Sequence, residues 1–216
     1  MSLYTAGVAR AYDRWAPVYD LVFGPVFARG RSAAVAAAER VGGRVLEVGV
    51  GTGISLPQYS SRLSVVGIDI SAPMLGKARA RVAKLRLRNV EALDVMDAES
   101  LVYGTASFDS VVAQYVVTAV PNPEAALDEF LRVVRPGGEI ILTSRIGAER
   151  GLRGTIERLL MPITARLGWR TEFPFERYRA WAAARGVTIL ERRPLPPLGH
   201  FSLIRFQKPN LERTQA

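Results

Sequence analysis

The chain has 216 residues, of which 49% are hydrophobic and 23% charged, values typical of a globular chain, most simply of one domain. It contains no cysteine and one histidine, which excludes disulfide scaffolds and thiolate chemistry and predicts a protein without a metal centre. The longest stretches without a charged residue have fourteen residues, so we expect no transmembrane segment, which needs about 20 apolar residues. The N-terminus shows no secretory signal, so we expect a cytoplasmic protein.

The net charge of +9 is unevenly distributed along the chain. Residues 45–144 carry a net charge of −2, whereas residues 1–44 carry +3 and residues 145–193 carry +6. Of the 29 basic residues, 26 are arginine, whose planar guanidinium suits phosphate oxygens. Basic segments on both sides of a near-neutral centre predict a polyanionic partner, either a nucleic acid or an anionic membrane surface.

Apolar strand patterns alternate with helical patterns along the chain. Strands are expected at 44–48, 63–70, 89–95, 108–115, 138–144, 187–193 and 200–207, and helices at 53–59, 72–84, 124–134 and 175–185. The alternation predicts an α/β fold with a mostly parallel sheet and helices on both faces. Residues 194–199 are too few for a crossover, so the last strand should run antiparallel. Gly137 and Gly138, after Pro136, are expected to end the helix before the fifth strand.

A glycine-rich motif follows the first strand. It has the form E-x-G-x-G-x-G and runs from Glu47 through Gly49 and Gly51 to Gly53. Such glycines let the backbone turn sharply and let a ligand approach main-chain N–H groups. The dinucleotide fingerprint G-x-G-x-x-G would need a glycine in place of Ile54, and Glu47 disfavours a nearby pyrophosphate. The spacing therefore favours a nucleoside ligand without a pyrophosphate.

Two further acidic residues follow the next two strands. Asp69 ends the second strand, 20 residues after Gly49, where a carboxylate accepts hydrogen bonds from ribose hydroxyls. Asp97 follows the third strand, where a carboxylate accepts from an exocyclic amine such as that of adenine. Ligands of open α/β sheets bind at the carboxyl ends of the strands, so the sequence predicts an adenosine site there.

These residues, together with Ala98 and Val134-Arg135-Pro136-Gly137-Gly138, resemble the motif series of the class I S-adenosylmethionine-dependent methyltransferases. The resemblance implies a Rossmann-like, seven-stranded sheet with the last strand reversed, and S-adenosylmethionine as the cofactor, with S-adenosylhomocysteine as its product. It implies that Glu47 holds the methionine end of the cofactor, Asp69 the ribose and Asp97 the adenine. The other residues expected at the cofactor are Tyr12, Tyr19, Gly49, Gly51, Thr52, Gly53, Ile70, Met74, Ala98 and Gln114.

The N-terminal segment carries a second resemblance. Residues 12–20 read Y-D-x-W-A-x-x-Y-D, which resembles the start of bacterial soluble-type phosphatidylethanolamine N-methyltransferases and, less closely, of ubiquinone/menaquinone C-methyltransferases. The first family implies transfer of methyl groups to phosphatidylethanolamine and its mono- and dimethyl derivatives, giving phosphatidylcholine. We expect a monomer that is peripherally associated with the inner face of the cytoplasmic membrane.

The expected domain organisation follows from the basic flanks. Residues 1–40 are expected to form amphipathic helices that act as a lid and membrane contact, and 41–208 the methyltransferase domain, followed by a flexible tail at 209–216. A basic amphipathic insertion is expected at about 146–172. The arginines expected to seat the phospholipid phosphate are Arg145, Arg150, Arg153 and Arg192.

Methylation of an amine requires a neutral nitrogen, so a proton acceptor is expected near the cofactor. The candidates are Tyr19, Tyr115 and His200. A nucleic-acid substrate is disfavoured, because Gln114-Tyr115-Val116-Val117 replaces the Asn/Asp-Pro-Pro-Tyr turn typical of nucleobase N-methylation. Three alternatives stay open: a quinone-precursor C-methyltransferase, another small-molecule methyltransferase that uses S-adenosylmethionine, and a non-catalytic membrane binder that depends on the cofactor.

Overall fold

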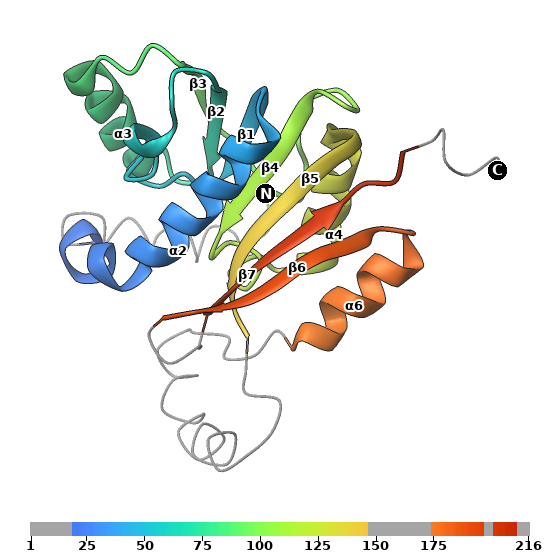
Figure 1. Ribbon diagram of the computed structural model, residues 1–216. Coiled ribbons are helices and arrows are strands. Elements are labelled where there is room, and N and C mark those ends of the chain that lie inside the picture. Colours follow the sequence, from blue (N-terminus) through green and yellow to red (C-terminus); the bar gives the residue numbers. More distant parts are fainter. Residues whose placement is uncertain (1–18, 147–173, 197–200, 211–216) are drawn as a thin grey trace.

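The computed structural model describes residues 19–146, 174–196 and 201–210, and within the first helix it describes side chains from residue 27 onward. Seven strands form one sheet in the order β3-β2-β1-β4-β5-β7-β6 (Figure 1). The strands β1 to β5 pair in parallel, and β7 runs antiparallel to both of its neighbours, β5 and β6. This arrangement confirms the predicted fold class and the reversed last strand. The strands are β1 (Arg44–Val48), β2 (Ser64–Asp69), β3 (Val90–Val95), β4 (Phe108–Gln114), β5 (Val134–Arg145), β6 (Thr188–Leu195) and β7 (Phe201–Gln207).

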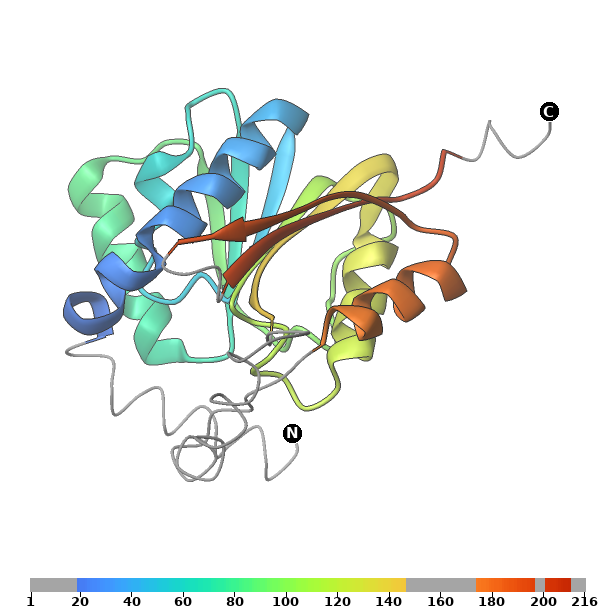
Figure 2. The same cartoon turned by 60° about the horizontal axis from the view of Figure 1, so that its bottom comes forward.

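Helices cover both faces of the sheet, and they divide its core into two layers. On one face, α2 (Tyr19–Val41) and α3 (Ala72–Leu85) bury small and aliphatic side chains, among them Val35 and Leu75. On the other face, α4 (Pro123–Val133) and α6 (Phe175–Ala184) bury larger ones, including Phe130 and Trp181. Figures 1 and 2 show α2 on one side of the sheet and α4 and α6 on the other.

The alanine-rich second half of α2 explains how closely this helix approaches the sheet. Ala34, Ala37 and Ala38 have no solvent exposure and lie in the same core layer as Val112 of β4 and Ile141 of β5. Small side chains let the helix axis lie near the strands, and alanine is also the best helix former. This half of α2 therefore belongs to the core, while the lid role expected for residues 1–40 stays a prediction, because residues 1–18 lie outside the description.

One predicted helix and the predicted cause of one helix end were wrong. Instead of a helix at 53–59, the chain forms a three-residue 3-10 helix, η1 (Leu56–Gln58), because the preceding residues are used in the glycine turn. The helix α4 ends at Val133, and Pro136 and Gly137 lie inside β5 rather than between the two elements. The end of α4 is set by its connection to β5, whose first residue, Val134, is fully buried and pairs with Phe108 of β4. Within the described ranges, no helix combines the length and apolarity needed to cross a membrane.

Two glycines provide a matched test of the packing. A Cβ on Gly138 would lie 2.5 Å from the carbonyl oxygen of Asp109, which the neighbouring strand holds in place, so Gly138→Ala should destabilise the protein by roughly 1–3 kcal/mol. Gly76, in the interior of α3, has no atom within 4 Å of an added Cβ, so Gly76→Ala should stabilise it by about 0.5–1 kcal/mol. Urea unfolding of both variants measures these changes, and equal effects would contradict the packing.

Candidate active site

The carboxyl ends of β1, β2, β3 and β4 meet at one edge of the sheet, and the predicted polar residues lie along it. Glu47 is next to last in β1, Asp69 and Gln114 are the last residues of β2 and β4, and Asp97 follows β3 by two residues. The parallel pairing of these four strands brings together residues that are up to 67 positions apart in the sequence. This edge is where α/β sheets bind ligands.

The three glycines after β1 form a tight turn. Gly49, Gly51 and Gly53 have φ values of 69°, 57° and 72°, in the left-handed region that favours glycine. A Cβ on Gly49 would lie 2.3 Å from a methyl group of Val116, so this glycine permits close packing. A Cβ on Gly51 would meet no atom within 4 Å, so its backbone borders open space. The turn is therefore packed on one side and accessible to a ligand on the other.

The carboxylate of Asp69 fixes this turn to the end of β2. Its two oxygens accept hydrogen bonds from the backbone N–H of Gly51 at 2.8 Å and of Ser71 at 2.9 Å. The same residue therefore shapes the loop and places a carboxylate at the ligand edge, where the ribose site is expected.

Glu47 is a buried carboxyl group in which one oxygen accepts hydrogen bonds and the other has no hydrogen-bond partner among the described residues. Its Oε1 accepts hydrogen bonds from the hydroxyl of Ser55 and, at 3.1 Å, from the amide of Gln114. Glu47 Oε2 and Gln114 Oε1 are both buried without a hydrogen-bond partner in the described part of the chain. Burial raises the pKa of Glu47 to about 7, although the hydroxyls of Ser55 and Tyr59 and the charge of Arg31 act in the opposite direction. Glu47 and Gln114, which are hydrogen-bonded to each other, thus each keep an acceptor oxygen that suits a cationic N–H donor such as an α-ammonium group.

Several residues around Glu47 were missed by the sequence interpretation. Ser55 and Tyr59 fall in the stretch wrongly expected to be helical, and the residue types alone gave no sign that they face Glu47. Arg31 of α2 lowers the pKa of both Glu47 and Tyr115, so its guanidinium lies near both side chains. The sequence had indicated only that Arg31 belongs to a basic surface. Arg81 of α3 donates a hydrogen bond to the carbonyl of Thr52 and supports the loop from outside.

The residues expected around the adenine lie at the same edge. Asp97 accepts a hydrogen bond from the N–H of Glu99 at 2.9 Å, which orients its carboxylate in a turn after β3. Met74 is buried in the first turn of α3, where its N–H bonds to the Ser71 hydroxyl at 3.3 Å, and Ile70 is partly exposed. Ala98 is buried against the α4 side of the core. Their contact with a nucleobase stays a prediction.

Tyr115 has an unusual backbone and a crowded side chain. Its φ of 63° is left-handed, a conformation that costs a non-glycine residue roughly 1–2 kcal/mol, and its N–H donates to the carbonyl of Thr143 at 2.7 Å. The ring lies 4.2 Å from that of Phe27 and 5.3 Å from that of Phe201, measured between centroids. Burial raises the pKa of Tyr115 to about 12, so the hydroxyl stays neutral at physiological pH and can act only by hydrogen bonding.

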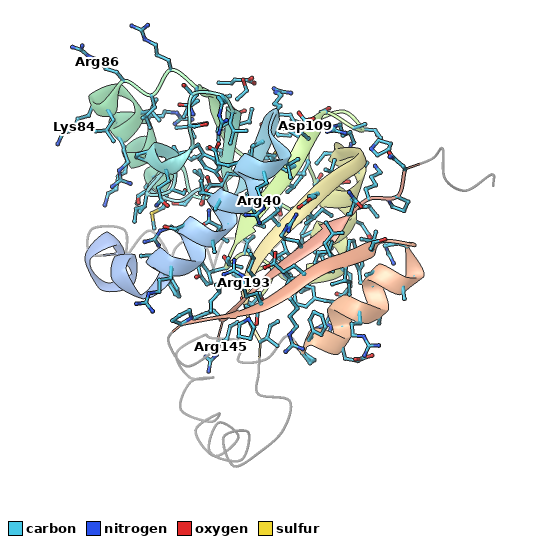
Figure 3. All side chains as sticks on the ribbon, in the orientation of Figure 1. Arg40, Lys84, Arg86, Asp109, Arg145 and Arg193 are labelled. Carbon is cyan, nitrogen blue, oxygen red and sulfur yellow. The ribbon has the colours of Figure 1, made fainter. Side chains whose placement is uncertain are left out.

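The two described candidates for the phosphate project from opposite faces of the sheet. Ser144 accepts a hydrogen bond from Tyr178 of α6, so Arg145, the next residue in β5, points to the α2 face. Figure 3 shows Arg145 at the carboxyl end of β5. The guanidinium of Arg192 lies 4.1 Å from the ring centroid of Phe175, on the α6 face. These two arginines therefore cannot share one phosphate group.

Other predicted site residues are not described. Tyr12, His200, Arg150 and Arg153 lie outside the described residues, and for Tyr19 only the backbone, at the start of α2, is described. Their roles stay predictions. Among the described residues, no group of three or more acidic or histidine side chains is arranged to hold a metal ion.

The described residues fit S-adenosylmethionine. Unsatisfied acceptors at Glu47 and Gln114 suit its ammonium group, the space beside Gly51 admits a ligand to the backbone, and the Asp69 carboxylate suits ribose hydroxyls. When bound, this group supplies a methyl group on a sulfonium centre. The chain's own residues bind and orient it.

Comparison with known proteins agrees with this assignment. Residues 46–142 match the family model described as a methyltransferase domain. The chain is 41% identical over 201 residues to phosphatidylethanolamine N-methyltransferase of Cereibacter sphaeroides, covering 93% of this chain and 97% of that protein. It is 37% identical over 142 residues to demethylmenaquinone methyltransferase of Renibacterium salmoninarum, covering 62% of this chain and 57% of that protein.

A solved structure has the same fold. Phosphoethanolamine N-methyltransferase 2 of Haemonchus contortus, in complex with phosphomonomethylethanolamine and S-adenosylhomocysteine, superposes with a TM-score of 0.74 at 18% identity, covering 97% of this chain and 61% of that one. Fold and site together define a class I methyltransferase that uses S-adenosylmethionine. Within that class, the chain belongs to the family of the C. sphaeroides phosphatidylethanolamine N-methyltransferase.

The raised pKa of Glu47 predicts a pH dependence of stability. Between pH 4.5 and about 7 the folded protein retains a proton that the unfolded chain has lost, so stability should fall as the pH rises through this range. The slope is about 1.4 kcal/mol per pH unit, or roughly 3 kcal/mol in total. Glu47→Gln removes this slope. In urea unfolding without cofactor, the free energy of unfolding of Glu47→Gln relative to wild type should therefore increase from pH 5 to pH 8. Glu176→Gln, at an exposed position of α6, is the control, and parallel curves for wild type and Glu47→Gln would contradict the assignment.

Gly30 and Tyr115 should be energetically coupled. A Cβ on Gly30 of α2 would lie 2.0 Å from the Tyr115 hydroxyl oxygen, so Gly30→Ala should destabilise the protein by roughly 1–3 kcal/mol although helix propensity favours alanine. Tyr115→Phe removes the clashing oxygen and should recover part of this loss. A double-mutant cycle in urea measures the coupling, and strictly additive effects would show that the two groups do not touch.

Proposed function

We propose that this protein transfers methyl groups from S-adenosylmethionine to the amine of phosphatidylethanolamine, and to its mono- and dimethyl derivatives, to make phosphatidylcholine at the membrane surface. The observation that carries the proposal is the 41% identity to phosphatidylethanolamine N-methyltransferase, which extends over 93% of this chain. The alignment thus reaches well beyond residues 46–142, which match the general methyltransferase model.

The proposed substrate must lose a proton before it reacts. A primary ammonium has no lone pair, and with a pKa of about 10.4, as for lysine, forming the neutral amine at pH 7 costs roughly 5 kcal/mol. Burial beside a positively charged sulfonium lowers this pKa by desolvation and like-charge repulsion. The remaining acceleration comes from positioning, which supplies roughly 7–11 kcal/mol in well-oriented reactions.

We propose different roles for the three candidate groups at the amine. With its pKa raised to about 12, Tyr115 orients the amine through a hydrogen bond rather than by accepting its proton. The proton acceptor is then His200 or Tyr19, and of these two side-chain types an imidazole has the ordinary pKa nearer to neutral pH. Arg145, on the α2 face at the end of β5, is the better of the two described candidates for the lipid phosphate, because Arg192 stacks on Phe175 on the opposite face.

We further propose that the protein acts as a monomer bound peripherally to the inner face of the cytoplasmic membrane. The lipid substrate is itself in a membrane, and the basic segments 1–40 and 146–172 suit anionic headgroups. Asp69, Asp97, Gly51 and Gln114 bind the cofactor in this proposal, with Glu47 at its ammonium group.

Methylation of a quinone precursor is the second candidate function. The similarity to demethylmenaquinone methyltransferase favours it, although that alignment covers only 62% of this chain. A quinol ring carbon needs a flat slot and deprotonation of a phenol, whereas a lipid amine needs a phosphate seat. The two substrates therefore give different products in one assay.

Product analysis tests the function directly. The full chain is incubated with methyl-labelled S-adenosylmethionine and liposomes with or without phosphatidylethanolamine, and the lipids are separated. We expect label in mono-, di- and trimethylated lipid only when phosphatidylethanolamine is present. Asp69→Asn, which keeps the size of the side chain but loses its charge, should lower the rate about tenfold or more by weakening cofactor binding. Arg179→Gln, on the exposed side of α6, should leave the rate unchanged.

Two results would contradict the proposal. One is the absence of labelled phospholipid when calorimetry shows that the same preparation binds S-adenosylhomocysteine. The other is label in demethylmenaquinol, supplied in place of the phospholipid, at a higher rate than in phosphatidylethanolamine.

A further inference from the structure

The two helical layers of the protein differ strongly in charge. The helices α2 and α3, with the turn that follows α3, carry nine basic and two acidic residues, whereas α4 and α6, with Arg185, carry four of each. These pairs of helices cover opposite faces of the sheet. The net positive charge of the described helices is therefore concentrated on the face formed by α2 and α3.

The basic side chains also differ in how they are used. On the neutral face, arginines are engaged in ion pairs: Arg177 with Glu124, Arg185 with Asp128, and others. At the end of α3, Lys84, Arg86 and Arg88 are exposed, and no hydrogen bond or ion pair of these side chains occurs within the described residues. Figure 3 shows Lys84 and Arg86 projecting outward from the end of α3.

An apolar side chain lies within this basic cluster. Leu85, between Lys84 and Arg86, is 49% exposed. Basic residues around an exposed leucine are typical of surfaces that lie on a bilayer, where the cations meet phosphates and the leucine enters the interfacial layer. We define Lys84, Leu85, Arg86 and Arg88 as the α3 cluster.

The direction of the helices connects the α3 cluster with the site. Both α2, which precedes β1, and α3, which follows Ser71, begin at the carboxyl edge of the sheet and run away from it. With fourteen residues, α3 is about 21 Å long. A flat surface that touches the α3 cluster and runs along this face therefore also reaches the edge where Asp69 and Glu47 lie.

We infer that the α3 cluster is a contact site for an anionic lipid bilayer, separate from the N-terminal segment and the 146–172 insertion, and that it orients the α2–α3 face against the membrane. The inference rests on the proposed function in one respect: because the proposed substrate is a lipid, we assign the α3 cluster to a lipid surface and not to another polyanion. The contact holds the open edge of the site at the level of the headgroups, where the proposed substrate amine lies.

Vesicle binding by charge variants of equal net charge tests this inference. The triple variant Lys84→Gln, Arg86→Gln, Arg88→Gln and the control Arg177→Gln, Arg179→Gln, Arg185→Gln each lose three positive charges, but from opposite faces. Sedimentation is measured with phosphatidylcholine vesicles that contain or lack phosphatidylglycerol. We expect the α3 variant to bind the anionic vesicles on the order of 100-fold more weakly than wild type, because each basic residue near such a surface contributes about fivefold. The control should change binding less than threefold.

Activity in detergent separates this inference from the proposed function. On phosphatidylethanolamine in neutral detergent micelles, the α3 variant should keep the wild-type rate, since its residues lie far from the site. Equal loss of vesicle binding in both triple variants would assign the effect to net charge and overturn the inference. Wild-type vesicle binding by the α3 variant would also overturn the inference. If that variant instead lost binding to a single-stranded RNA oligonucleotide, the α3 cluster would be assigned to a nucleic acid. Failure of the proposed function would appear as no lipid methylation by the wild type itself.

Discussion

The buried carboxyl group of Glu47 sets the conditions for the rest of the site. Burial raises its pKa to about 7, so ionising it in the folded protein costs free energy that a nearby cation offsets. Ser55 and Gln114 bond to only one of its oxygens, which leaves the second oxygen as an acceptor for a ligand. The site thus suits a positively charged donor, such as the ammonium group of S-adenosylmethionine that we propose Glu47 binds.

The loop around this carboxylate is held in place by the protein itself. Asp69 bonds to the N–H of Gly51 from the end of β2, and Arg81 bonds to the carbonyl of Thr52 from α3. These contacts fix the left-handed glycine turn without help from a ligand, so less ordering remains to be done on binding. The α2 helix completes the arrangement, since its Gly30 accommodates Tyr115 while its alanines join the core.

Much of the fold and of the candidate cofactor site could be predicted from the sequence, because both depend on local sequence patterns. Alternating apolar strands and helices predicted the seven-stranded sheet, and the short segment before β7 predicted its reversal. The glycines and the acidic residues Glu47, Asp69 and Asp97 follow successive parallel strands, and such strands end at one edge whatever their separation in the chain. The sequence alone therefore predicted an adenosine site at this edge, and the resemblance of its motifs to a known family supplied the cofactor class.

Only the tertiary structure decided how the remaining side chains combine. Ser55 approaches Glu47 from the start of η1, and Arg31 approaches it from α2, which packs against β4, β5 and β7. No periodic pattern in the sequence records such long-range contacts. The helix expected at 53–59 did not form, since the glycine turn takes up its first residues. Arg145 and Arg192 were grouped by charge, but strand alternation sends them to opposite faces. Residue type fixes which chemistry is available, whereas packing fixes which groups meet.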